Sequence, residues 1–74
     1  MRFIEFKELT YMNGGYISAG LCVAVDDVSR VVECADDYSR TNLITSDGKI
    51  HTLNEKYQDV VKKLRNACLD EVGE

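Results

Sequence analysis

Residues 42–53 read NLITSDGKIHTL, two short runs of apolar and β-branched residues on either side of an Asp-Gly pair at 47–48. An Asp-Gly pair between two such runs is a strong hairpin signal, because a type I′ turn needs positive φ at both of its central residues. The segment therefore predicts two antiparallel strands, over about 42–46 and 49–53, joined by a two-residue turn. In that register Ile44 lies opposite His51.

The segment after this hairpin predicts a helix over about residues 55–68. Its apolar residues recur at helical spacing and would form one stripe: Tyr57, Val60, Val61, Leu64, Ala67 and Cys68. Asn54 is a suitable N-cap, because its side-chain oxygen can accept a hydrogen bond from an unpaired first-turn N–H. Acidic residues dominate 70–74, next to the negative end of the helix dipole, so we expect a frayed acidic tail there.

Three further strand regions precede the hairpin, over about residues 2–9, 16–28 and 31–35. A glycine-containing turn over 11–15 separates the first two, because glycine adopts positive φ without steric cost. Gly20 lies inside the second region and suggests a β-bulge or bend at that point.

The expected order is thus five strands followed by one helix, with short connections. A chain of 74 residues is one domain at most, and we assign that domain to residues 1–69. The predicted fold class is α+β and mainly β. Two architectures fit it: a small antiparallel sheet of about five strands, or an SH3-like or Sm-like small barrel, in either case with one C-terminal amphipathic helix. So small a core is marginal alone, and a homo-oligomer or a protein partner would add stability.

The formal net charge is −4 at pH 7. This charge weighs against nucleic-acid binding, because Lys and Arg that neutralise phosphates supply most non-specific affinity, although it does not exclude a local basic face. Charges interrupt residues 1–8 every two or three positions, unlike a signal peptide. No apolar run approaches the roughly 20 residues of a membrane span. We therefore expect a cytoplasmic protein that makes no membrane contact.

Few residues in this chain could support metal or nucleophile chemistry. The cysteines and the histidine are Cys22, Cys34, His51 and Cys68. They lack the paired spacing of a zinc site, and an odd cysteine count without disulfide spacing fits free thiols, which we expect to be small buried hydrophobic residues. No phosphate-binding glycine loop or catalytic motif is present. We predict a non-enzymatic protein with no catalytic, metal or cofactor site.

Charge is segregated along the chain. Basic residues gather on the exterior of the predicted helix: Lys56, Lys62, Lys63 and Arg65. Acidic residues gather in the strands and loops before it: Asp26, Asp27, Glu33, Asp36, Asp37 and Asp47. The basic helix face is the candidate contact for a protein partner or for nucleic-acid phosphates, although an ordinary solvated helix surface has the same pattern.

Within residues 40–64, the segments TSDGK (45–49) and LNEKYQDVVKKL (53–64) resemble the C-terminal half of the FlbD-type (SwrD-type) small flagellar and swarming accessory proteins. The helix pattern of that family is matched here by Leu53, Glu55, Asp59, Val60, Val61, Lys63 and Leu64. This chain departs from the family at Lys56, where the family has a serine, and over 30–40, which looks inserted. The resemblance implies a non-enzymatic cytoplasmic accessory protein and carries over no catalytic residue.

Three functional hypotheses follow from these features. The leading one is a small binding or regulatory module that acts through protein–protein contacts, since a partner could extend an exposed strand edge. The alternative is a nucleic-acid-binding Sm-like or SH3-like small barrel that uses the basic helix face. A third is a phage-type inhibitor that places its acidic strand surface over a basic site of a host protein.

Overall fold

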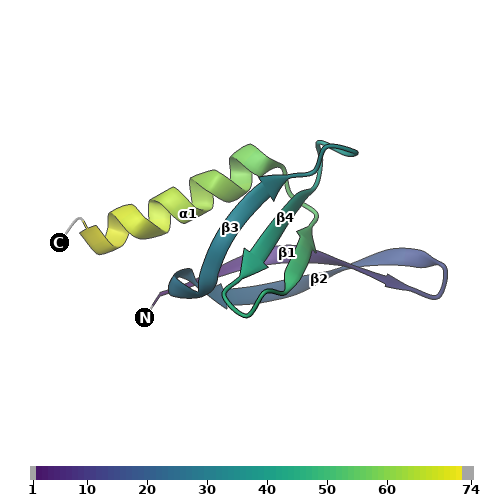
Figure 1. The fold of residues 1–74 in the computed structure, drawn as a ribbon, viewed down its shortest axis with the longest axis horizontal. Helices are drawn as coiled ribbons and strands as arrows, with labels where there is room; N and C mark the ends of the chain where they lie inside the picture. The colour runs from purple at the N-terminus through teal and green to yellow at the C-terminus, as the bar shows by residue number, and fades with distance from the viewer. Residues whose placement is uncertain (1, 73–74) are drawn as a thin grey trace.

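Five strands and one C-terminal helix follow one another as predicted in the computed structural model, which describes the backbone of residues 2–72 and the side chains of residues 2–68. The elements are β1 (Phe3–Met12), β2 (Gly15–Ala24), the 3-10 turn η1 (Val25–Asp27), β3 (Val28–Glu33), β4 (Thr41–Thr45), β5 (Ile50–Leu53) and α1 (Tyr57–Val72). The strands form one antiparallel sheet in the order β2-β1-β5-β4-β3 (Figure 1). The α+β fold class is confirmed. The sheet is open between β2 and β3, so of the two predicted architectures the small sheet is the one that forms.

The β1–β2 hairpin is the longest feature of the sheet. Its two ten-residue strands pair one to one, from Phe3 opposite Ala24 to Met12 opposite Gly15. Asn13 (φ 52°) and Gly14 (φ 82°) form its two-residue turn, and positive φ at both positions is the mark of a type I′ turn. β1 therefore continues three residues past its predicted end. The bulge expected at Gly20 is absent from this continuous pairing. The sheet irregularity lies in β3 instead, between Val28 and Arg30.

The β4–β5 turn is not the predicted two-residue turn. The Thr45 N–H donates to the Lys49 carbonyl at 3.0 Å, which encloses three loop residues, and of these only Gly48 has positive φ (88°). The Asp47 carboxylate accepts hydrogen bonds from the Thr45 hydroxyl and from the Lys49 N–H, and this stabilises the longer loop. His51 consequently lies opposite Leu43 rather than Ile44, a shift of one residue that changes which side chains face each other.

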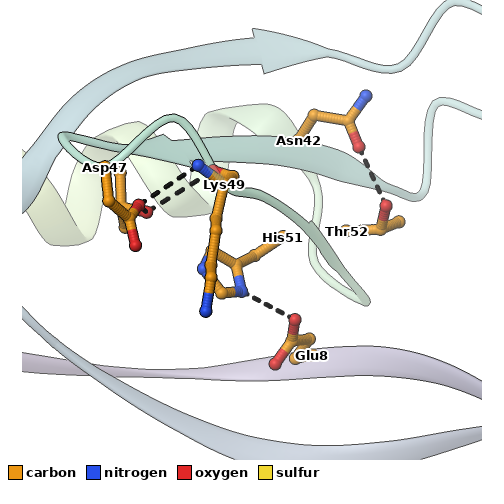
Figure 2. Close-up of polar contacts among 7 residues, drawn as sticks. Glu8, Asn42, Asp47, Lys49, His51 and Thr52 are labelled. Atoms are coloured by element: carbon orange, nitrogen blue, oxygen red, sulfur yellow. Dashed lines mark hydrogen bonds and ion pairs between the residues drawn. The ribbon is translucent and has the colours of Figure 1, made fainter.

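The hairpin and the three-stranded β3–β4–β5 unit meet near the middle of β1. Glu8 opposite Leu53 is the one residue pair of the β1–β5 ladder in the described part of the chain. The Asn54 N–H donates to the Lys7 carbonyl at 2.7 Å, and the Glu8 carboxylate lies 2.8 Å from Nδ1 of His51 (Figure 2). Because the two units cross at this point, the far end of the hairpin extends past the rest of the sheet.

The core lies between one face of the sheet and α1. Its buried apolar side chains are Ile4, Phe6, Val23, Leu43, Leu53, Val60 and Ala67. In β4, Thr41 and Thr45 are buried on the same face as Leu43, and the Thr41 hydroxyl donates to the Glu55 carbonyl at 2.8 Å. Of the apolar stripe predicted for the helix, Val60 and Ala67 are buried in this core and Leu64 packs against it, since burial of apolar surface stabilises the fold. Val61 and Cys68 lie instead on the flank of α1 that the sheet leaves uncovered.

The boundaries of α1 differ from those predicted. The helix begins at Tyr57, and the Val60 N–H donates to the Lys56 carbonyl at 3.0 Å, so Asn54 is not the N-cap. Asn54 is held by its backbone bond to β1 instead. The helix also continues to Val72 rather than ending near 68, because no glycine or proline interrupts it before Gly73 and the unfavourable charge–dipole contact costs only about 0.3–1 kcal/mol. Of the predicted frayed tail, residues 73–74 lie outside the described residues.

The cysteines are not buried as expected. Cys22 and Cys68 are exposed and Cys34 is half-buried, and all three are free thiols. Cys22 lies opposite Glu5 in the hairpin, on the face of β1–β2 that alternates away from the buried Ile4 and Val23, whereas α1 covers the other face. Between residues 2 and 72, no helix is long and apolar enough to span a membrane.

Candidate functional site

The far end of the β1–β2 hairpin, residues 9–20, is the part of the molecule that projects furthest, and we call it the hairpin tip. Figure 1 shows it running out beyond the other strands, at the end of the molecule away from α1. The protein measures 46 Å along its longest axis and 21 and 19 Å along the others. From Leu9 to Val25 the sequence holds no charged residue, although 30% of the whole chain is charged. The tip is thus both prominent and uncharged.

Large apolar side chains are exposed on both faces of this tip. Tyr11 and Tyr16 are 64% and 58% exposed, and Met12 and Ile17 are 50% and 48% exposed. Tyr11 pairs with Tyr16 across the strands, so the two rings share one face. Strand alternation puts that face opposite to the one that carries Phe6 and the core. An exposed apolar cluster of this kind marks an interaction site more often than isolated surface residues do.

The two tyrosines form a cluster with an arginine from a distant loop. Their ring centroids lie 5.3 Å apart in an edge-to-face arrangement, and Cζ of Arg40 lies 4.8 Å from the centroid of the Tyr16 ring. We call these three residues the tyrosine–arginine patch. Arg40 comes from the loop before β4, so it links that loop to the hairpin tip. Tyrosine and arginine are among the residue types enriched at energetically dominant interface positions.

The loop that carries Arg40 is held in place by Asp37. The Ser39 hydroxyl and the Ser39 N–H donate to the Asp37 carboxylate at 2.6 and 3.0 Å, and Nε of Arg40 lies 3.4 Å from it. The two Ser39 bonds, with a smaller contribution from the Arg40 charge, lower the pKa of Asp37 below its ordinary value. The carboxylate therefore stays ionised near neutral pH and orients the guanidinium that packs on Tyr16.

The four basic residues predicted as a contact face do not form one cluster. Lys62 and Arg65 line the same shallow hollow on the exposed side of α1. Lys56 lines a separate hollow between the start of α1 and the loop before β4. Lys63 lies on the flank of the helix that faces β1, because its ammonium donates to the Glu5 carbonyl at 3.2 Å.

Lys63 is engaged within the fold. Its ammonium lies 2.8 Å from the Glu55 carboxylate and 5.1 Å from the centroid of the Phe6 ring. Glu55 in turn accepts a hydrogen bond from the Lys7 N–H at 2.9 Å. These contacts join α1 to β1 through one cation, so Lys63 is a structural residue. Of the four basic residues predicted as a contact face, Lys56, Lys62 and Arg65 remain as candidates for contact.

A second apolar surface runs along the flank of α1 that the sheet leaves uncovered. Its lining residues are Val61, Leu64, Arg65 and Cys68. Leu64 also packs against the edge of the core. This groove is shallow and lies on the face of the molecule opposite to the tyrosine–arginine patch, which is on the sheet face away from α1.

His51 is one of the residues considered for metal or nucleophile chemistry, and it is paired with a carboxylate. The hydrogen-bonding partner of His51 is the Glu8 carboxylate, which joins β5 to β1 (Figure 2). Among the residues that the structure describes, no group of three or more His, Cys, Asp or Glu side chains is placed to hold a metal ion. The His51–Glu8 pair is therefore a half-buried link between strands.

The prediction of site residues from sequence overlooked the hairpin tip. The available signal was the uncharged stretch from Leu9 to Val25, with Tyr11 and Tyr16 placed symmetrically about the Asn13-Gly14 turn. The part played by Arg40 had no such signal, because only the folded chain brings it to Tyr16. In comparisons with protein-family models, curated proteins and solved structures, this chain gave no match.

Proposed function

We propose that this protein is a small non-enzymatic binding module that docks on a protein partner through its hairpin tip. The observation that carries the proposal is the tyrosine–arginine patch, two exposed tyrosines on a projecting and uncharged hairpin with an arginine from the loop before β4 packed on one of them. Aromatic rings give large contact area at low entropic cost, because they have only two side-chain torsions to immobilise.

A partner of this patch would combine an apolar pocket with at least one acidic or carbonyl group. Tyr11 and Tyr16 would fill the pocket, and their hydroxyls would hydrogen-bond at its rim. Arg40 is already oriented by Asp37 and by the Tyr16 ring, so little conformational entropy is lost when it pairs with an acceptor. This preorganisation favours protein recognition over loose electrostatic contact.

The proposal is tested by retention of a partner on the immobilised full chain, followed by calorimetry with the purified partner. Replacing Tyr11 and Tyr16 by serine should weaken binding by roughly thirtyfold or more, the effect of losing a dominant interface residue. Tyr38→Ser is the matched control, since Tyr38 is an equally exposed tyrosine outside the patch, and it should leave affinity within about twofold of the parent.

Two results would contradict this proposal. One is a partner whose affinity is unchanged by loss of both tyrosines. The other is retention of mixed-sequence RNA that falls steeply with salt and is lost when Lys62 and Arg65 are changed to glutamate. That second result would support the nucleic-acid hypothesis, for which the adjacent Lys62 and Arg65 provide the basic surface.

The resemblance to FlbD-type accessory proteins and the phage-type inhibitor hypothesis both concern the identity of the partner. Both are compatible with a docking hairpin, and the inhibitor hypothesis adds a specific expectation. An inhibitor would use the acidic loops, so binding would weaken when Asp26 and Asp27 are changed to asparagine. A binding module that uses the patch alone would tolerate those two changes.

A further inference from the structure

The outer edge of β2 presents backbone groups that no other strand of the sheet pairs with. β2 is one of the two outermost strands. The Lys7 carbonyl accepts a hydrogen bond from the Asn54 N–H, so the backbone groups of Lys7 point towards β5 and not towards β2. Gly20 lies opposite Lys7 in the hairpin. In an antiparallel pair of this kind, Gly20 directs its own N–H and C=O away from β1. By the same alternation, five β2 residues direct their backbone N–H and C=O groups away from β1: Tyr16, Ser18, Gly20, Cys22 and Ala24.

This edge lacks the features that usually prevent one strand from pairing with another. Outer strands are commonly protected by charges, prolines or bulges. The opposite edge, β3, has such protection: a register irregularity between Val28 and Arg30, and charges at Arg30 and Glu33. β2 has no charge, no proline and no bulge along its ten residues. The contrast between the two edges of one sheet indicates that β2 is a pairing surface.

The charge distribution favours another copy of the same chain as the source of the second strand. Each copy carries a net charge of −4, so most of its surface repels a second copy. The stretch from Leu9 to Val25 differs from the rest of the chain, because it contains no charged residue and so does not repel the same stretch of a second copy. Two β2 strands placed side by side therefore bring together no charged residues of their own, over a length of about 34 Å for ten residues.

We propose that two copies of this protein associate through their β2 edges, antiparallel about a two-fold axis perpendicular to the sheet. The result is one continuous sheet that runs from β3 of one copy to β3 of the other, with the two unprotected edges removed. An isologous contact of this kind closes on itself and leaves the protected β3 edges outermost. Both tyrosine–arginine patches then lie on the same face of the joined sheet, which would make the dimer bivalent if the proposed partner binding holds.

The test is sedimentation of the full chain over a range of concentrations, under reducing conditions so that Cys22 does not cross-link. The mass should rise from 8.4 kDa towards twice that value. Ser18→Glu places two carboxylates at the paired edges and should raise the dimer dissociation constant by at least about tenfold. Ser29→Glu is the matched control, an exposed serine on the β3 edge, and should leave the dissociation constant unchanged.

Hydrogen exchange of individual amides identifies the surface independently of any variant. Exchange at Ser18, Gly20 and Cys22 should slow with rising protein concentration. Exchange at Ile17 and Ala19 should not, because their N–H groups point to β1 in both states. A chain that remains at 8.4 kDa at several hundred micromolar would overturn the proposal. So would a dimer that is indifferent to Ser18→Glu and leaves the outward amides unprotected. Either result is separate from partner binding, which depends on Tyr11 and Tyr16.

Discussion

Lys62 and Lys63 are neighbours in sequence, but the fold gives them different surroundings. Lys62 is exposed beside Arg65, whereas Lys63 reaches Glu55, the Glu5 carbonyl and the Phe6 ring. Glu55 is the more buried partner of this pair and also holds the Lys7 backbone. The Lys63 ammonium therefore contacts several groups at the junction of α1 and β1, and the structure records no such contact for Lys62 within the described part of the chain.

Replacing Lys63 by alanine should lower the free energy of unfolding by about 1 kcal/mol, because a partly exposed ion pair, a backbone hydrogen bond and a cation–π contact are lost together. Lys62→Ala should change it by less than about 0.5 kcal/mol, the usual range for a surface substitution. Urea denaturation of the two variants measures the difference. Equal losses would show that the Lys63 contacts are not formed in solution.

At the scale of elements, the two hairpins have different turns, and the two-residue turn predicted for Asp47-Gly48 does not form there. Asn13-Gly14 forms the two-residue turn with two positive φ values, whereas Asp47-Gly48 belongs to a three-residue loop with one. Asp47 accounts for the longer loop, because its carboxylate accepts hydrogen bonds from the Thr45 hydroxyl and the Lys49 N–H. Those two bonds, in that order, lower the pKa of Asp47 from its ordinary value of 3.8.

Gly48→Ala should destabilise the protein by about 1–2 kcal/mol, because its φ of 88° lies in the left-handed region that a side chain disfavours. No atom lies within 4 Å of the added methyl group, so the loss would come from the backbone alone. Gly15→Ala is the control, since Gly15 has equal space and no positive φ, and it should be neutral or slightly stabilising. Thermal unfolding of both variants compares them; a neutral Gly48→Ala would contradict the loop geometry.

For the whole molecule, the core depends on how the hairpin crosses the three-stranded unit. Leu53 in β5 is opposite Glu8 of β1 and is fully buried, with Phe6, Leu43 and Val60 in the same cluster. Every layer of the protein meets at this point: hairpin, three-stranded unit and helix. The hairpin tip and the exposed flank of α1 extend from it in different directions and contribute little to the core.

Leu53→Ala should destabilise the protein by about 2–5 kcal/mol, the cost of removing a buried leucine and leaving a cavity. In a domain of this size such a loss is comparable with the whole free energy of unfolding. Ile50→Ala, in the same strand but at a side chain 65% exposed, should cost much less. Circular dichroism during urea titration measures both. Similar losses for the two variants would mean that β5 does not sit in the core as described.

The sequence by itself determined the number, order and type of the elements, because these depend on local signals: apolar periodicity for α1, and turn residues for the two hairpins. It also predicted the apolar stripe of α1, of which Val60 and Ala67 are buried in the core. It did not predict the register at the Asp47 loop, because the Asp47 carboxylate stabilises a three-residue loop in place of the two-residue turn that Asp-Gly favours.

Only the tertiary structure decided which surfaces remain open. It left the hairpin tip uncovered, brought Arg40 to Tyr16, and turned Lys63 from a candidate contact into a link between α1 and β1. These outcomes depend on the crossing of β1 and β5 at Glu8 and Leu53, a contact between residues 45 positions apart. Local sequence carries no direct signal for such a crossing, because its geometry follows from the packing of the whole core.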